Sequence, residues 1–131
     1  MMNLLAVAVG GALGSVMRYL FVGMVNSRTI APSSIPLGTF SVNVIGSFLI
    51  GLLIIVIQHR FEEDTWIRPL LVVGLLGGFT TFSAFSLETI QLIQSGFMTK
   101  AIMNMLGNVL VCLVATGLGV LCCHGLNQLY S

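Results

Sequence analysis

The residues best placed to do chemistry lie in residues 74–86, which read GLLGGFTTFSAFS. This stretch combines three glycines with the hydroxyl groups of Thr80, Thr81, Ser83 and Ser86. Because glycine in a helix interior costs roughly 1 kcal/mol relative to alanine, the cluster predicts an unwound break between two half-helices. Carbonyl groups freed at such a break could hold a small cation. The alternative is a flexible but continuous helix.

Two phenylalanines follow directly. Phe82 and Phe85 stand three residues apart and therefore share one helix face, with Ser83 and Glu88 interleaved. The positive edge of an aromatic ring could face an anion without carrying a full charge. Glu88 is the only acidic residue inside an expected membrane span, and such a group is a functional candidate. It either extends the face of Phe85 or pairs with Arg18 to fix helix packing.

Polar side chains also repeat at four-residue spacing along two other apolar segments, each on one helix face. One stripe is Thr39, Asn43 and Ser47, and the other is Asn104, Asn108, Cys112 and Thr116. Asparagine within lipid is expensive unless it is hydrogen-bonded or hydrated. The stripes therefore indicate either interhelical hydrogen bonds or, as we favour, one shared hydrated path.

Membrane-spanning helices must position these residues. Of the 131 residues 56% are hydrophobic and only 7% charged, whereas soluble domains carry about 25% charged residues. A helix needs about 20 apolar residues to cross a bilayer, and we expect four such runs, at residues 4–25, 37–57, 69–94 and 100–122. The third run is longer than a comfortable span, which favours a break near mid-membrane. The predicted fold is an all-α membrane protein with a single four-helix domain over residues 1–131.

Composition and motifs argue against several function classes. The net charge of +1 gives no reason to expect nucleic acid as a partner. The three cysteines lie in one late apolar segment, where we expect small packing residues rather than disulfides or metal ligands. The sequence offers no nucleophile with a base and no paired carboxylates, so we do not expect an enzyme.

Charge and small residues bear on assembly. Arg60 and Arg68 fall on one side of the membrane, and Arg28 and Lys100 fall on the other, toward which Arg18 leans. Because basic residues set orientation, this balance permits insertion both ways, which would allow an antiparallel homodimer. Two stripes of small residues allow close helix packing, within the chain or between copies. The first small-residue stripe is Ala6, Gly10 and Gly14, and the second is Asn43, Ser47 and Gly51.

A resemblance to a known family covers nearly the whole chain and rests on three segments. They are GGALGSVMRY in the first span, GTFSVNVIGSFLIG in the second and GLLGGFTTFSAFSLE in the third. On these motifs the sequence resembles the Fluc/CrcB family of fluoride channels. The resemblance implies a dual-topology, antiparallel homodimer in the bacterial inner membrane. Such a dimer exports cytoplasmic fluoride passively and thereby lowers its toxicity.

The resemblance also implies roles for individual residues. Phe82 and Phe85 match the pore phenylalanines of the family, and Asn43 matches its pore asparagine. The backbone carbonyls of Gly77 and Thr80 match the site of a structural sodium ion at the dimer centre, shared by both subunits. A buried cation would offset part of the desolvation cost of nearby anions.

Further positions match the fluoride pathway or depart from the family pattern. Ser83, Glu88 and Asn108 match parts of a polar track along the third and fourth spans. Ala84 stands where the family commonly has threonine, and Asn104 stands where it often has tyrosine. These two departures bear on the route of the ion, and they spare the phenylalanines and the sodium positions.

Two other functions remain alternatives. A small dual-topology multidrug exporter has the same size and number of spans. It would need a carboxylate in the first span, where the charged residue is Arg18. A non-transporting membrane assembly subunit would explain the small-residue stripes, but it would not explain three polar faces and a mid-membrane break.

Overall fold

The computed structural model describes residues 1–27, 35–60 and 66–129, and all regular structure in them is helical. The elements are α1 (Met2–Asn26), α2 (Leu37–Arg60), the π-helix η1 (Pro69–Leu76), α3 (Gly77–Phe79), α4 (Phe82–Gln94) and α5 (Met98–Leu129). Four segments are long and apolar enough to cross a membrane: Met2–Asn26, Leu37–Gln58, Pro69–Gln94 and Met98–Cys123. The prediction of an all-helical chain with four such segments is confirmed. Arg28 and the connections at 28–34 and 61–65 lie outside the described residues.

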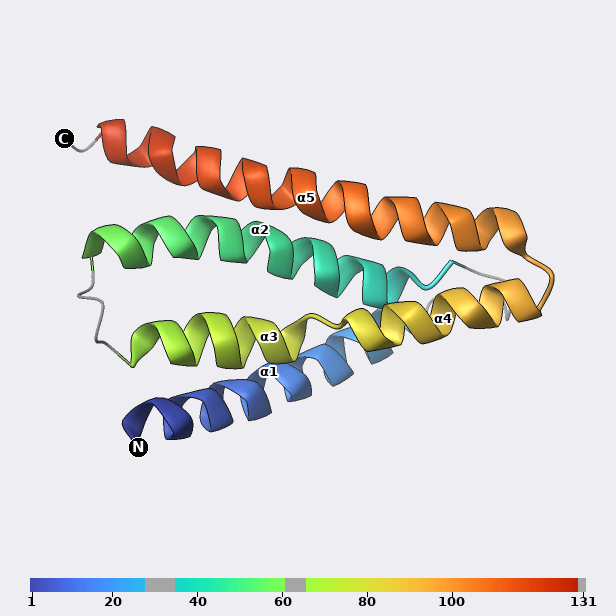
Figure 1. Ribbon diagram of the computed structural model, residues 1–131, viewed down its shortest axis with the longest axis horizontal. Helices are drawn as coiled ribbons and strands as arrows, with labels where there is room; N and C mark the ends of the chain where they lie inside the picture. The colour runs from blue at the N-terminus through green and yellow to red at the C-terminus, as the bar shows by residue number, and fades with distance from the viewer. Residues whose placement is uncertain (28–34, 61–65, 130–131) are drawn as a thin grey trace.

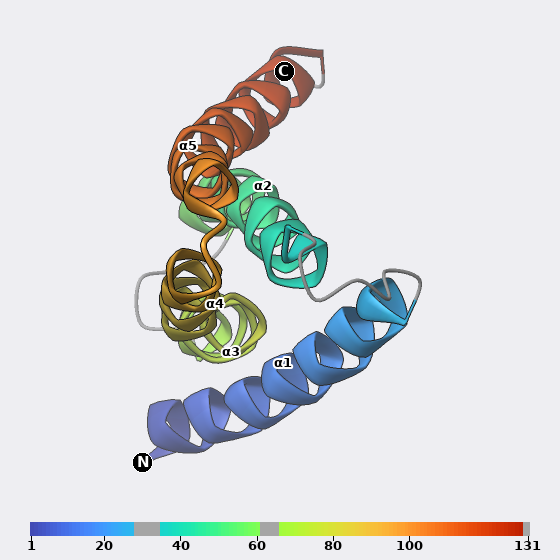
Figure 2. The same ribbon diagram turned by 90° about the vertical axis from the view of Figure 1, so that its right-hand side faces the viewer.

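The helices form a layered bundle. In Figure 1, α2 lies between α5 and the row formed by η1, α3 and α4, and α1 lies on the other side of that row. Figure 2 shows α1 inclined to this row, so that its C-terminal end approaches the start of α2. There a Cβ on Gly38 would lie 2.7 Å from the side-chain oxygen of Asn26.

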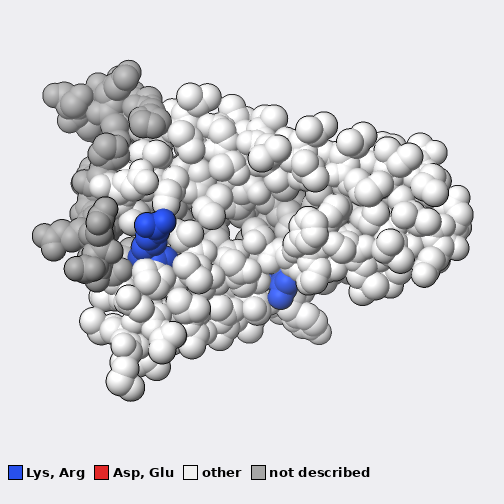
Figure 3. Space-filling view, viewed as in Figure 1, with Lys and Arg blue, Asp and Glu red and all other residues white. Residues whose placement is uncertain are grey.

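The exterior of the bundle is apolar and part of its interior is polar. Figure 3 shows a face on which the described atoms are almost all uncharged. Large exposed apolar side chains occur on every long helix, among them Leu13, Leu49, Leu106 and Leu113. The buried polar residues are Thr39, Thr81, Thr89, Asn104 and Asn108. Lipid explains this distribution, because it solvates apolar surface and forces polar groups to find partners inside the protein.

Both small-residue stripes are used within the chain. All three members of the first stripe are buried, and α1 packs there against η1 and α3. A Cβ on Gly74 would lie 2.8 Å from the carbonyl oxygen of Val7, and one on Gly78 would lie 2.7 Å from that of Gly11. A Cβ on Gly51, in the second stripe, would collide with the backbone of α5. Close packing within the monomer therefore accounts for the first stripe and for Gly51 of the second.

The backbone of the third span is extended at two residues between α3 and α4. Thr80 has φ −84° and ψ 159°, and Thr81 has φ −153° and ψ 120°. Gly74, Gly77 and Gly78 are helical, so the glycines do not themselves form the extended segment. Threonine is β-branched and accepts extended backbone readily. Two of these glycines serve the contact with α1 instead.

Gly14→Ala tests the close packing of α1. The added Cβ would collide with the carbonyl oxygen of Leu75, which cannot move without shifting η1. We expect the free energy of unfolding to fall by about 1–3 kcal/mol, measured by thermal unfolding in detergent. Gly23→Ala is the matched control, because its Cβ would meet nothing within 4 Å. An equal loss in both variants would contradict the packing account.

Candidate functional site

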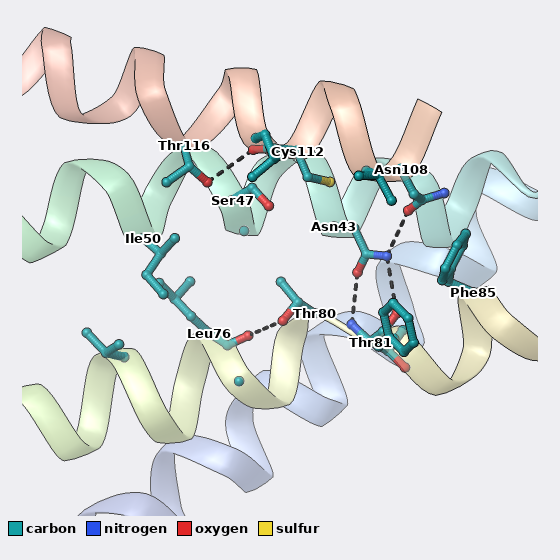
Figure 4. Close-up of a pocket in the computed structure, with 16 residues that line it drawn as sticks. Asn43, Ser47, Ile50, Leu76, Thr80, Thr81, Phe85, Asn108, Cys112 and Thr116 are labelled. Atoms are coloured by element: carbon teal, nitrogen blue, oxygen red, sulfur yellow. Dashed lines mark hydrogen bonds between the residues drawn. The ribbon is translucent and has the colours of Figure 1, made fainter. Parts of the chain in front are cut away.

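The side chain of Asn43, on α2, bonds to both backbone groups of Thr81. Its Nδ2 donates to the Thr81 carbonyl at 3.1 Å, and its Oδ1 accepts from the Thr81 N–H at 2.8 Å (Figure 4). The side-chain amide of Asn43 thus makes the two hydrogen bonds to Thr81 that a neighbouring β-strand would make to an extended residue. This pairing matters because a buried backbone group without a hydrogen bond costs several kcal/mol in a membrane interior.

A chain of hydrogen bonds continues from Asn43 across α5 and back to α4. The second hydrogen of Asn43 Nδ2 goes to Asn108 Oδ1 at 3.0 Å, and Asn108 Nδ2 donates to both oxygens of Asn104 at 3.1 Å. Asn104 Nδ2 donates to Thr89 Oγ1 at 2.8 Å, and that hydroxyl donates to the Phe85 carbonyl at 2.8 Å. For these asparagines the alternative of interhelical hydrogen bonding is correct. Asn104 is a full member of the network.

The same bonds change the partners of two backbone carbonyls. In an uninterrupted helix the Gly77 carbonyl would accept from the Thr81 N–H, and the Thr80 carbonyl would accept from the Ala84 N–H. Instead the Thr81 N–H bonds to Asn43 Oδ1, and the Ala84 N–H bonds to the Thr81 hydroxyl at 3.2 Å. Carbonyl oxygens released in this way are the groups that unwound membrane helices present to Na⁺.

An open cavity of about 450 Å³ lies beside this interruption, between α2, the third span and α5. We call it the phenylalanine groove. It is lined by six of the eight residues predicted for ion binding, namely Asn43, Gly77, Thr80, Phe82, Phe85 and Asn108. Ser47, Cys112 and Thr116 also line it, from the two predicted polar stripes. The structure therefore gathers most of the predicted site into one place.

The two phenylalanine rings lie next to each other at this groove. Their centroids are 5.2 Å apart and the rings are tilted by 59°. Phe85 is 7% exposed, whereas Phe82 is 76% exposed. Phe82 thus stands on an open face of the single chain.

Glu88 lies in a second cavity, of about 740 Å³, between α1, α2 and α4. We call it the Arg18 cavity. Thr39 Oγ1 donates to Glu88 Oε1 at 2.6 Å, while Glu88 Oε2 is buried and has no hydrogen-bond partner among the described residues. Arg18 lines the same cavity, yet within the described ranges no ion pair joins it to Glu88. Thr81 lines both cavities, and its hydroxyl lies 3.2 Å from that of Ser83.

Sequence reasoning named Thr81 in the hydroxyl cluster and Thr39 and Asn104 in the polar stripes, but it missed Thr89 and the bonds that these residues make. Thr81 immediately precedes α4 and accepts the Ala84 N–H, which is the role of a helix N-cap. A threonine before an apolar helical run is a readable signal for that role. No local signal identifies the bonds of Thr39 to Glu88 and of Asn104 to Thr89, because each joins two helices.

A bundle of four apolar helices around polar groups and an open groove defines a multi-pass membrane protein with an internal polar site. Residues 5–120 match the family described as "CrcB-like protein, Camphor Resistance (CrcB)", and the chain belongs to that family. The predicted resemblance is confirmed. Several similar proteins carry the name "Fluoride-specific ion channel FluC". That of Magnetococcus marinus is 45% identical over 91% of this chain and 95% of its own length. That of Agrobacterium fabrum is 43% identical over 92% of this chain and 94% of its own length. That of Geobacter sulfurreducens is 45% identical over 92% of this chain and 96% of its own length.

Asn108→Leu tests the hydrogen-bond network. It keeps the volume but leaves a hydrogen of Asn43 and the oxygens of Asn104 without this partner, so we expect a loss of about 1–3 kcal/mol in unfolding free energy. Thr116→Val is the matched control from the same groove, since that hydroxyl bonds only to the Cys112 carbonyl of its own helix. Thermal unfolding in detergent measures both. Unchanged stability of Asn108→Leu would show that the network contributes little.

Proposed function

We propose that this chain is the subunit of a fluoride-specific ion channel that exports fluoride passively. The observation that carries the proposal is family membership over nearly the whole chain, with relatives of that name covered almost end to end. The phenylalanine groove supports it, because it places aromatic edges beside amide and hydroxyl groups without catalytic chemistry. A membrane potential drives such export with about 2.3 kcal/mol per charge per 100 mV. Helical spans place the protein in the bacterial inner membrane, since outer membranes hold closed barrels.

The channel is proposed to be an antiparallel, dual-topology homodimer. One chain leaves the phenylalanine groove open and Phe82 largely exposed, so it lacks a wall that a second copy would supply. The first small-residue stripe already packs within the chain, which favours the groove face as the interface. The weak bias of basic residues, described above, permits insertion in both orientations. Thr80 and Thr81 lie near the middle of the Pro69–Gln94 span, and we place this interruption at mid-membrane.

A structural sodium ion fits the carbonyls of Gly77 and Thr80. Both residues line the groove, and the amides that would bond their carbonyls in a continuous helix are engaged elsewhere. Carbonyl oxygen is a hard donor suited to Na⁺. Two carbonyls from each of two copies would surround an ion at the dimer axis. When bound, the ion supplies a positive charge that lowers the cost of anions beside it.

The remaining site residues suggest the route of the anion. The Arg18 cavity offers a cationic entrance with Glu88 and Thr39 on its wall. Thr81 separates this cavity from the phenylalanine groove, and Ser83 lies against its hydroxyl. An ion would pass from one cavity to the other at this point and then meet the edges of Phe82 and Phe85. Asn108 lines the far wall of the groove.

Reconstitution in liposomes tests the proposed function. We expect the pure protein to release fluoride, but not chloride, when ion-selective electrodes follow efflux. Phe82→Ile and Phe85→Ile should each reduce the fluoride rate by tenfold or more, about 1.4 kcal/mol, because an aliphatic side chain has no positive edge. Both variants should still elute as dimers. Absent fluoride efflux, or equal chloride efflux, would refute the assignment.

A further inference from the structure

We propose that Asn43 serves the channel as a positioning residue for the cation site, and that it does not bind the anion directly. It acts together with the hydroxyl of Thr81. We call this pair, the Asn43 side-chain amide and the Thr81 hydroxyl, the Thr81 clasp. The inference rests on the proposed function, because the cation site and the anion pathway belong to that proposal.

The first argument is that Asn43 has no hydrogen left to donate. A primary amide has two N–H donors and one carbonyl oxygen. One hydrogen goes to the Thr81 carbonyl at 3.1 Å and the other to Asn108 Oδ1 at 3.0 Å, while the oxygen accepts from the Thr81 N–H at 2.8 Å. An anion could take a hydrogen from Asn43 only by leaving one of these acceptors unpaired in a part-buried position, which is costly.

The second argument concerns what the clasp does to the backbone. Asn43 Oδ1 accepts the hydrogen bond of the Thr81 N–H, which in a continuous helix would donate to the Gly77 carbonyl. The Thr81 hydroxyl oxygen accepts the hydrogen bond of the Ala84 N–H, which in a continuous helix would donate to the Thr80 carbonyl. Each half of the clasp therefore releases one of the two carbonyls proposed to bind sodium. This one-to-one correspondence is the observation that assigns the clasp to the cation.

The third argument is that other helices hold the clasp in place. Asn43 projects from α2 and is bonded to Asn108 of α5, which is in turn bonded to Asn104. Thr81 is buried and also starts α4. Without the clasp, the Thr81 and Ala84 N–H groups could take part in a continuous helix. They would then donate to the Gly77 and Thr80 carbonyls, which would no longer be available to a cation. Loss of the clasp should therefore weaken the cation site before it alters contacts with the anion.

A sodium titration of protein stability tests this inference without measuring transport. The detergent-purified dimer is transferred to sodium-free buffer, and its unfolding temperature is measured as NaCl replaces choline chloride. A ligand that binds the folded state raises this temperature, so the titration gives a midpoint for Na⁺. Asn43→Leu and Thr81→Val should each raise that midpoint by about tenfold or more, the factor that corresponds to roughly 1.4 kcal/mol. Thr81→Ser should restore it, and Gly117→Ala, whose Cβ would meet nothing within 4 Å and which lines neither cavity, should leave it unchanged.

Fluoride efflux from liposomes, measured at saturating sodium, separates the remaining outcomes. A wild-type sodium midpoint in Asn43→Leu, combined with a changed dependence on fluoride concentration, would overturn the inference and make Asn43 an anion ligand. If Asn43→Leu does not fold, the comparison of Thr81→Val with Thr81→Ser decides, and equal midpoints would overturn the inference. If the wild-type protein releases fluoride but its unfolding temperature does not change with sodium, the inference is overturned while the proposed function stands. Sodium binding without fluoride efflux would refute the proposed function instead.

Discussion

The structure depends on one constraint, that a backbone group buried in a membrane protein must find a hydrogen-bond partner. At Thr81 the helix does not supply that partner, and the side chain of Asn43 does. The interruption of the third span and the release of the Gly77 carbonyl follow from this pairing, and the Thr81 hydroxyl releases the Thr80 carbonyl by accepting the Ala84 N–H. Phe82 and Phe85 sit in the first turn of α4, so the same bonds also set where their rings lie.

Close helix packing provides the rigid frame for this interruption. Glycines bring α1 against η1 and bring α2 against α5, with backbone atoms in direct contact. Asn43 and Thr81 therefore approach each other from two well-fixed elements, and a shift of either helix would break short bonds. This packing also uses small residues of the chain for contacts within the monomer. The phenylalanine groove remains open, and it is the face that we propose a second copy covers.

Local pattern was enough to predict the helical class, the four spans and the shared face of Phe82 and Phe85, because composition, run length and helical periodicity determine them. It also indicated an interruption near Thr80 from glycines and hydroxyls together, but the glycines are helical, and Gly74 and Gly78 pack against α1. Spacing could not predict the Asn43–Thr81 pairing or the bond from Asn104 to Thr89, since each depends on how two helices are positioned along their axes relative to each other. Nor could spacing decide that Glu88 bonds to Thr39 rather than to Arg18. The specific ion came from resemblance and not from physical chemistry.

The account holds that two copies of this chain enclose a passive pathway that admits fluoride and rejects chloride. The most direct measurement is the reversal potential of the wild-type protein in a planar bilayer, with fluoride on one side and chloride on the other. The account predicts that current reverses close to the limit set by fluoride alone, far from zero. A reversal potential near zero would mean that both anions pass equally, and it would contradict the account.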